Sequence, residues 1–159
     1  MQFIIKGGRT LAGAIAVAGS KNGATPIIAA TLLTSKPCIL SNVPRVSDVE
    51  TMLAILRSIG SRQRWLTEHT VEIVNDALDS EQLDQSLVCK IRSSVLLLGP
   101  LLARFGRLKI STPGGCHIGI RPIDTHLEAL RRSGATVSFD SESGFYDIVL
   151  GKPVNTEVV

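Results

Sequence analysis

A pattern of predicted secondary structure occurs twice along this chain in the same order, and it limits the possible folds more than any other feature. A helix, a strand, a second helix and a two-stranded hairpin follow one another twice, and sliding the sequence along itself until Gly60 falls on Gly134 superimposes the two copies. In this register five of the thirteen positions in residues 48–60 are identical. Copies of a supersecondary unit pack around a common core. Residues 155–159 resemble the opening of a third copy, so we expect two units and the start of another.

Four helices are expected from hydrophobic periodicity and from residues typical of helix ends. The second begins with a capping box, with Ser47 as the N-cap and Glu50 at the third position, and it stops at Gly60. The pair Gly99-Pro100 should kink or divide the third helix, because proline lacks a backbone donor. The expected ranges are residues 24–33, 47–59, 88–103 and 122–133, with Pro26 and Pro122 in the first turns of the first and last.

Short apolar or alternating runs bounded by glycine, proline or polar turns predict the strands. Two antiparallel hairpins are expected, one from residues 62–66 and 70–74 and the other from residues 136–140 and 145–150. The remaining predicted strands are residues 3–6, 14–18, 37–41 and 108–111.

The composition excludes several classes of protein. With 44% hydrophobic and 19% charged residues the chain is not intrinsically disordered, and 4% aromatic content is too low for a nucleic-acid stacking platform. No run approaches the roughly 20 apolar residues of a membrane helix, and the N-terminus lacks a signal peptide. We therefore expect a cytoplasmic protein with no membrane or nucleic-acid partner. Three widely spaced cysteines do not support a zinc site or a disulfide framework.

The charges gather in blocks, although the net charge is only +3. Residues 1–45 carry a net charge of +5 and residues 90–132 one of +6, with −5 between them and −3 after them. Two separate cationic segments suit several side chains that converge on a small anion better than they suit a nucleic-acid surface. Chance clustering of basic residues is the alternative.

A turn of small residues, Gly19-Ser20-Lys21-Asn22, lies between a predicted strand and a predicted helix. The free N–H groups at a helix start favour an anion, Lys21 adds a positive charge, and Asn22 adds an amide that donates and accepts. The spacing is not that of a Walker A loop. As a bare pattern the turn fits an anion site, but it also fits a plain turn with a solvated lysine.

Residues 112–119 form a predicted loop in which a proline and three glycines surround Cys116. A thiol in such a loop is accessible, and nearby cations such as Arg121 raise its reactivity, so Cys116 can serve as a nucleophile or a proton donor. The alternative is a free cysteine with no role, and a Cys–His pair with His117 is disfavoured because adjacent side chains point apart. Cys38 and Cys89 lie in apolar patterns and are expected in the core.

The helix after that loop offers a second anion site. Its first N–H groups and Arg121 suit a phosphate or diphosphate. Asp124 would accept hydrogen bonds from a sugar or base, or would simply complement the helix dipole. Arg92 is a further candidate, because an arginine in an otherwise apolar helix usually points to an edge or a cleft.

In order and spacing, these residues resemble one family closely. The chain is similar to the UDP-N-acetylglucosamine 1-carboxyvinyltransferases, the enolpyruvyl transferases that begin peptidoglycan synthesis. The resemblance covers the whole chain, and the combination of motifs is far more specific than any one of them. The motifs are KN at residues 21–22, IRSS at 91–94, GPLLARFG at 99–106, PGGC at 113–116 and RPIDTH at 121–126.

The resemblance implies an activity and a set of site residues. Family members transfer the enolpyruvyl group of phosphoenolpyruvate to the 3′-hydroxyl of UDP-N-acetylglucosamine and release phosphate, with no metal or organic cofactor. Lys21 and Asn22 would bind phosphoenolpyruvate, and Cys116 would be the catalytic proton donor and the thiol that fosfomycin alkylates. The residues that would hold the UDP-sugar are Arg92, Arg121, Pro122, Ile123, Asp124 and Thr125.

The resemblance also implies an α/β enolpyruvyl transferase fold, an inside-out barrel of repeated βαβαββ units in two domains. Residues 1–18 would supply N-terminal strands, the first of them belonging with a second domain that this chain lacks. Residues 19–159 would form an incomplete first domain. Because family members are more than twice as long, the missing domain or another chain is expected to be needed for activity.

Two alternatives remain open at this point. The chain could be a truncated, non-catalytic fragment that at most binds a UDP-sugar. More distantly, it could belong with the shikimate-pathway enolpyruvyl transferase, which shares the fold but is not known for the Pro-Gly-Gly-Cys loop.

Overall fold

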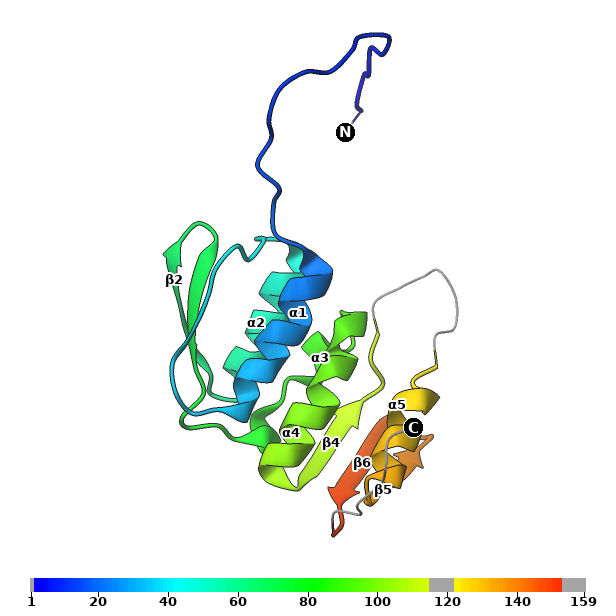
Figure 1. Ribbon diagram of the computed structural model, residues 1–159. Helices are drawn as coiled ribbons and strands as arrows, with labels where there is room; N and C mark the ends of the chain where they lie inside the picture. Colours follow the sequence, from blue (N-terminus) through cyan, green and yellow to red (C-terminus); the bar gives the residue numbers. More distant parts are fainter. Residues whose placement is uncertain (1, 115–121, 153–159) are drawn as a thin grey trace.

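The computed structural model describes residues 2–114 and 122–152 (Figure 1). Its helices are α1 (Lys21–Ala30), α2 (Ser47–Ser58), α3 (Gln85–Val88), α4 (Leu98–Phe105) and α5 (Asp124–Arg132), with short 3₁₀ helices η1 (Thr31–Leu33), η2 (Ser80–Gln82) and η3 (Arg92–Leu97). Its strands are β1 (Cys38–Leu40), β2 (Arg62–Thr67), β3 (Thr70–Val74), β4 (Arg107–Ser111), β5 (Ala135–Asp140) and β6 (Phe145–Leu150).

The predicted repeat is present as two units with the same topology. In the first unit an antiparallel sheet has the order β1-β3-β2, and in the second the order is β4-β6-β5. Each helix, α2 or α5, joins the edge strand to the hairpin of its own unit. Gly60 and Gly134 end the two helices in the same way, because each has a positive φ and donates its N–H to the carbonyl three residues earlier.

The helices between the units build one hydrophobic core. Helix α1 packs against α2 and η3, and α4 packs against β4 and β6, so that α1, α2 and α4 lie between the two sheets (Figure 1). The largest fully buried side chains are Ile28, Leu32, Met52, Leu53, Ile55, Leu56, Ile59, Ile73, Leu97, Leu101, Leu102 and Leu108. They come from both units and from the helices that join them, as a repeat with a shared core requires.

The strands predicted at residues 3–6 and 14–18 are not formed. Residues 2–20 contain no helix or strand, and residues 3–17 run away from the body of the molecule (Figure 1). Phe3, Ile5, Leu11 and Ile15 are at least 80% exposed. A strand needs a neighbour for its backbone hydrogen bonds, and none lies beside this segment in the described part of the chain. The first strand of a βαβαββ unit is therefore missing from the first unit.

Two helix predictions were wrong in detail. The expected helix over residues 88–103 is three pieces, α3, η3 and α4, and the interruption falls at residues 89–91 instead of at Gly99-Pro100. Pro100 lies in the first turn of α4, where a missing N–H costs nothing. Helix α1 begins three residues earlier than expected, so Pro26 lies in its second turn.

The expected capping box of α2 is also absent. The N-cap is Val46, whose carbonyl accepts from Glu50 N at 3.0 Å, and no side chain caps the helix. The Glu50 carboxylate does not reach back to the helix start, because it accepts a hydrogen bond from Arg45 Nε at 3.0 Å. The Arg45–Glu50 ion pair thus takes the place of the capping contact that the sequence predicts for Glu50.

Candidate functional site

The turn before α1 is fixed by a close approach of two backbones. A Cβ atom at Gly19 would overlap the carbonyl oxygen of Asn42, so only glycine fits there. Asn42 itself has φ of 54°, in the left-handed region that asparagine tolerates better than most residues. The start of α1 is thereby held against the loop that leads into α2.

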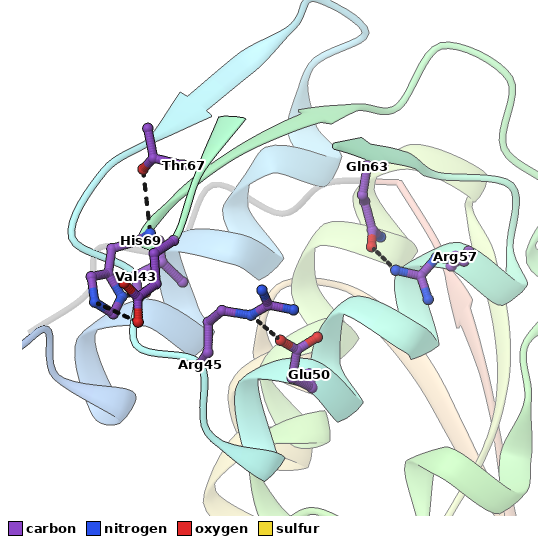
Figure 2. A network of polar contacts seen from close by, with 8 residues as sticks. Val43, Arg45, Glu50, Arg57, Gln63, Thr67 and His69 are labelled. Carbon is purple, nitrogen blue, oxygen red and sulfur yellow. Dashed lines mark hydrogen bonds and ion pairs between the residues drawn. The ribbon is translucent and has the colours of Figure 1, made fainter. Parts of the chain in front are cut away.

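That loop, residues 42–46, is braced by the hairpin of the first unit. Val43 N donates to His69 O at 2.9 Å, and His69 Nδ1 lies 3.3 Å from Val43 O. Arg45 pairs with Glu50 and stacks over the Trp65 ring at 4.6 Å. Figure 2 shows His69 turned toward Val43, and Arg45 reaching toward Glu50. The loop therefore gives α1 and α2 a defined relative position.

Lys21, the first residue of α1, forms an ion pair that the sequence did not reveal. Its Nζ lies 2.7 Å from Oδ2 of Asp48 in the first turn of α2, and the two side chains are 50% and 34% exposed. A helix-start aspartate is usually explained by the helix dipole, and nothing in the local pattern connected it with a lysine at the start of the preceding helix. Asn22 follows Lys21 in the same turn and is exposed.

The root of the loop after β4 is packed tightly against α3. A Cβ atom at Gly114 would overlap the carbonyl oxygen of Cys89. Gln85 Oε1 accepts from Ser111 N at 2.8 Å, and Cys89 Sγ lies 3.2 Å from Ser111 Oγ. These contacts fix the direction in which the chain leaves the sheet. Cys116 and Arg121, two predicted site residues, lie outside the described residues.

The expectation that Cys89 belongs to the core is wrong, because the residue is exposed. It follows a four-residue helix, and its thiol faces the loop root instead of the core. Cys38 is half-buried on the edge strand β1.

Arg92 ties η3 to the start of α5. Its Nη2 donates to the Pro122 carbonyl at 2.9 Å. Helix α5 begins at Asp124 instead of Pro122, with Ile123 as a buried N-cap residue. Pro122, Asp124 and Thr125 are exposed around this helix start. The structure therefore brings Arg92 together with the segment to which sugar binding was assigned.

The two groups of predicted residues belong to neighbouring elements. Helix α1, which carries Lys21, packs against η3, which carries Arg92. No hydrogen bond joins these two side chains in residues 2–114. A hollow of about 390 Å³ beside α1 is lined by Gly23, Ile27, Ile39 and neighbouring residues, but neither Lys21 nor Asp48 lines it. We therefore do not assign it to the site.

The carboxyl groups with clearly shifted pKa lie away from this region. The Ser86 hydroxyl and the Leu87 N–H lower the pKa of Asp84, which caps α3. The Ser143 hydroxyl lowers the pKa of Asp140 in the turn before β6, and the Arg107 guanidinium lowers that of Asp147. These groups stabilise caps, turns and a sheet. Within the described residues no three His, Cys, Asp or Glu side chains gather in a way that would hold a metal, and no helix is long and apolar enough to cross a membrane.

Known proteins similar to this chain are carboxyvinyltransferases. The chain is 46% identical over 138 residues to UDP-N-acetylglucosamine 1-carboxyvinyltransferase of Bradyrhizobium diazoefficiens, which covers 87% of this chain and 32% of the relative. It is 42% identical over 146 residues to the protein of the same name from Campylobacter hominis, covering 91% and 34%. The predicted resemblance is confirmed, and the chain spans about a third of the length of these relatives.

Solved structures agree on the fold. The enolpyruvyl transferase NikO from Streptomyces tendae superimposes with a TM-score of 0.76 at 25% identity, over 93% of this chain and 32% of that one. EPSP synthase from Acinetobacter baumannii superimposes with a TM-score of 0.65 at 20% identity, over 87% of this chain and 32% of that one, a likeness of fold alone. The expected α/β enolpyruvyl transferase fold is confirmed. A family model described as EPSP synthase (3-phosphoshikimate 1-carboxyvinyltransferase) matches residues 5–157, and the chain belongs to this family.

Proposed function

We propose that this chain is part of an enzyme that transfers the enolpyruvyl group of phosphoenolpyruvate to the 3′-hydroxyl of UDP-N-acetylglucosamine, in the cytoplasm, as the first committed step of peptidoglycan synthesis. One observation carries this choice over the shikimate-pathway reaction. Relatives that bear the UDP-sugar enzyme's name are 42–46% identical over 86–91% of the chain, whereas the solved EPSP synthase is 20% identical.

Lys21 and Asn22 are the proposed contacts of phosphoenolpyruvate. The position of Lys21 supports this role, because its half-exposed ammonium stands at a helix start that no side chain caps. The first N–H groups of α1 and the ammonium both favour an anion. Phosphoenolpyruvate carries a phosphate and a carboxylate, so a locus with a cation and free backbone donors suits it.

Arg92 and residues 121–125 are the proposed contacts of the UDP-sugar. The hydrogen bond from Arg92 to the Pro122 carbonyl supports them, because it joins two segments that lie far apart in the sequence. The exposed start of α5 adds backbone donors that suit a diphosphate. Asp124 would accept hydrogen bonds from the sugar or the base.

Cys116 is the proposed acid of the reaction. Its proton would go to C3 of phosphoenolpyruvate while the sugar oxygen adds at C2 and gives up its hydroxyl proton to a base on the other wall of the cleft. Loss of phosphate with removal of a proton from C3 would then restore the enol ether. The Cys89 carbonyl, which leaves room only for glycine at position 114, supports a fixed departure of this loop from β4. No metal or organic cofactor is required for these steps.

Residues 19–159 are proposed as an incomplete first domain, and residues 1–18 as N-terminal strands, the first of which belongs with a second domain. Transition-state stabilisation requires donors on both walls of a cleft, and this chain would supply one wall. We therefore expect the isolated 159-residue chain to bind UDP-N-acetylglucosamine weakly and to show little or no transfer. Phosphate release that requires both substrates and Cys116 would contradict the second expectation.

The experiment that tests the assignment combines binding with labelling. UDP-N-acetylglucosamine, and not shikimate 3-phosphate, should shift the NMR signals of residues 122–125, and the reverse result would favour the shikimate-pathway reaction. Fosfomycin should add one adduct, at Cys116, by intact-mass and peptide analysis. The exposed Cys89 is an internal control, and Cys116→Ala should abolish the adduct. Equal labelling of Cys89 and Cys116 would remove the case for a tuned thiol.

A further inference from the structure

The backbone of the first unit brings Lys21 and Asp48 close together. Gly19 fixes the start of α1 against Asn42, and the loop from Asn42 leads directly into α2. The first turns of the two helices are therefore neighbours before any side chain is placed. Lys21 Nζ and Asp48 Oδ2 meet at 2.7 Å as a consequence of this arrangement.

The Asp48 carboxylate has a polar neighbour at each oxygen. Oδ2 accepts from Lys21 Nζ, and Oδ1 lies 3.5 Å from Ser47 Oγ. An ammonium group has three donors, and within the described residues Asp48 is the one hydrogen-bond partner of Lys21 Nζ. Two donors of the ammonium thus remain for a ligand, while the third holds the side chain in place.

The repeat supplies an independent argument for this role. The register that places Gly60 on Gly134 also places Asp48 on Pro122, and Pro122 is the residue whose carbonyl accepts from Arg92. In each unit, therefore, a cation from the preceding helical segment contacts the same position at the start of the unit's helix. In the first unit the acceptor is a side chain, whereas in the second it is the backbone.

Stability does not account for the Lys21–Asp48 pair. Half-exposed ion pairs contribute about 0–1 kcal/mol, and a carboxylate beside an anion site lowers the attraction for the anion. Arg45–Glu50 has nearly the same exposure and also involves the first turn of α2, but it lies on the Trp65 side. The Arg45–Glu50 pair therefore serves as a control for the Lys21–Asp48 pair, because its cation, Arg45, has no proposed ligand.

We propose that Asp48 is a positioning residue for Lys21, which it orders so that the ammonium presents its remaining donors to the phosphate or carboxylate of phosphoenolpyruvate. The proposal rests on the proposed function, because it takes Lys21 as the ligand contact. A lysine side chain loses considerable rotamer freedom when it binds a ligand. Asp48 removes part of that freedom in advance, and this lowers the entropic cost of binding.

The test is a phosphoenolpyruvate titration of the 159-residue chain, followed by the backbone amide NMR signals of Asn22 and Gly23. Asp48→Ala should weaken binding about 2- to 10-fold, which is the cost of ordering one long side chain. Asp48→Asn should restore binding to near the wild-type value, because its amide oxygen still accepts from the ammonium. Glu50→Ala, the matched control, should change nothing.

The outcomes separate the positioning role from its alternatives. Tighter binding by both Asp48 variants would mean that the carboxylate only opposes the anion, and unchanged binding would mean an ordinary surface pair; each result overturns the proposal. Loss of binding in Lys21→Ala with unchanged binding in Asp48→Ala overturns the positioning role alone. If the wild-type chain shows no Lys21-dependent response, the proposed function fails at this residue, and the positioning role fails with it.

Discussion

The two repeat units share a topology but bury their helices to different degrees. Helix α2 buries Val49, Met52, Leu53, Ile55 and Leu56, whereas α5 buries only Leu127. The difference follows from the neighbours, because α1 and η3 cover α2 on the side away from its sheet, while α5 makes its main contacts with β5. A unit of this kind thus specifies its own strand order, and the elements around it decide how much of its helix becomes core.

Substitutions at equivalent positions of α2 and α5 test this difference in burial most directly. Met52 is fully buried, and the residue at the same repeat position is the exposed His126. Met52→Ala should lower the free energy of unfolding by about 2–5 kcal/mol, because it leaves a cavity, whereas His126→Ala should stay within about 0.5 kcal/mol. Urea denaturation followed by circular dichroism measures both. A similar cost at the two positions would contradict the asymmetry.

The glycines that end the two helices test what the units have in common. Gly60 and Gly134 have φ values of 102° and 95°, so alanine at either position should cost about 1–2 kcal/mol in backbone strain. Gly60→Ala should cost more than Gly144→Ala, because its Cβ would lie 2.5 Å from the Ala77 carbonyl oxygen, whereas a Cβ at Gly144 would meet nothing within 4 Å. Thermal and chemical denaturation give both values. Gly144→Ala, at a positive φ with open space around it, is the control for strain alone.

The cation at the start of each unit's helix allows a functional comparison. Arg92→Ala removes the charged donor from the Pro122 carbonyl, and a hydrogen bond to a charged group is worth about 1.5–3 kcal/mol. UDP-N-acetylglucosamine binding, measured by calorimetry, should weaken about tenfold or more, while phosphoenolpyruvate binding should change little. Equal loss of both ligands would mean that Arg92 supports the whole fold instead of the start of α5.

The smallest expected effect concerns the ion pairs that join neighbouring strands, one pair within each sheet. Arg107 contacts both oxygens of Asp147, at 3.0 and 2.7 Å, whereas Arg64 contacts Glu72 once, at 3.2 Å. The Arg107 side chain lowers the pKa of Asp147. A carboxyl with a lowered folded pKa adds stability above its unfolded pKa, and that stability is lost as the pH falls through the folded value.

Asp147→Asn should therefore flatten the fall in stability on acidification below about pH 4, the unfolded pKa of an aspartate. Denaturation midpoints of the wild type and of Asp147→Asn, measured from pH 7 to pH 2, check this expectation. An equal slope for wild type and Asp147→Asn would show that the two-oxygen contact does not persist in solution.

The hairpins and the helix ends of both units were predictable, because alternating side chains and the glycines at 60 and 134 are local signals. The break at residues 89–91 was not, because no local residue marks it; the close approach of Gly114 to the Cys89 carbonyl occurs there and involves a segment distant in the sequence. The capping box failed because the Glu50 carboxylate pairs with Arg45, five residues earlier in the chain, instead of reaching back to the helix start. At the candidate site, Lys21, Asn22 and Arg92 could be selected by residue type. Asp48 could not, because its significance depends on the approach of two helices.

Arg104 has a consequence for how the first unit comes apart. Its guanidinium donates to the carbonyls of Leu32 and Thr34 after α1, and to that of Asn75 after β3. Three carbonyls, two from the segment after α1 and one from the segment after β3, therefore share one planar cation from α4. Separating either segment from α4 leaves its carbonyl oxygens without this donor. The two segments should therefore unfold in one concerted step, and their backbone amides should exchange hydrogen at a common rate.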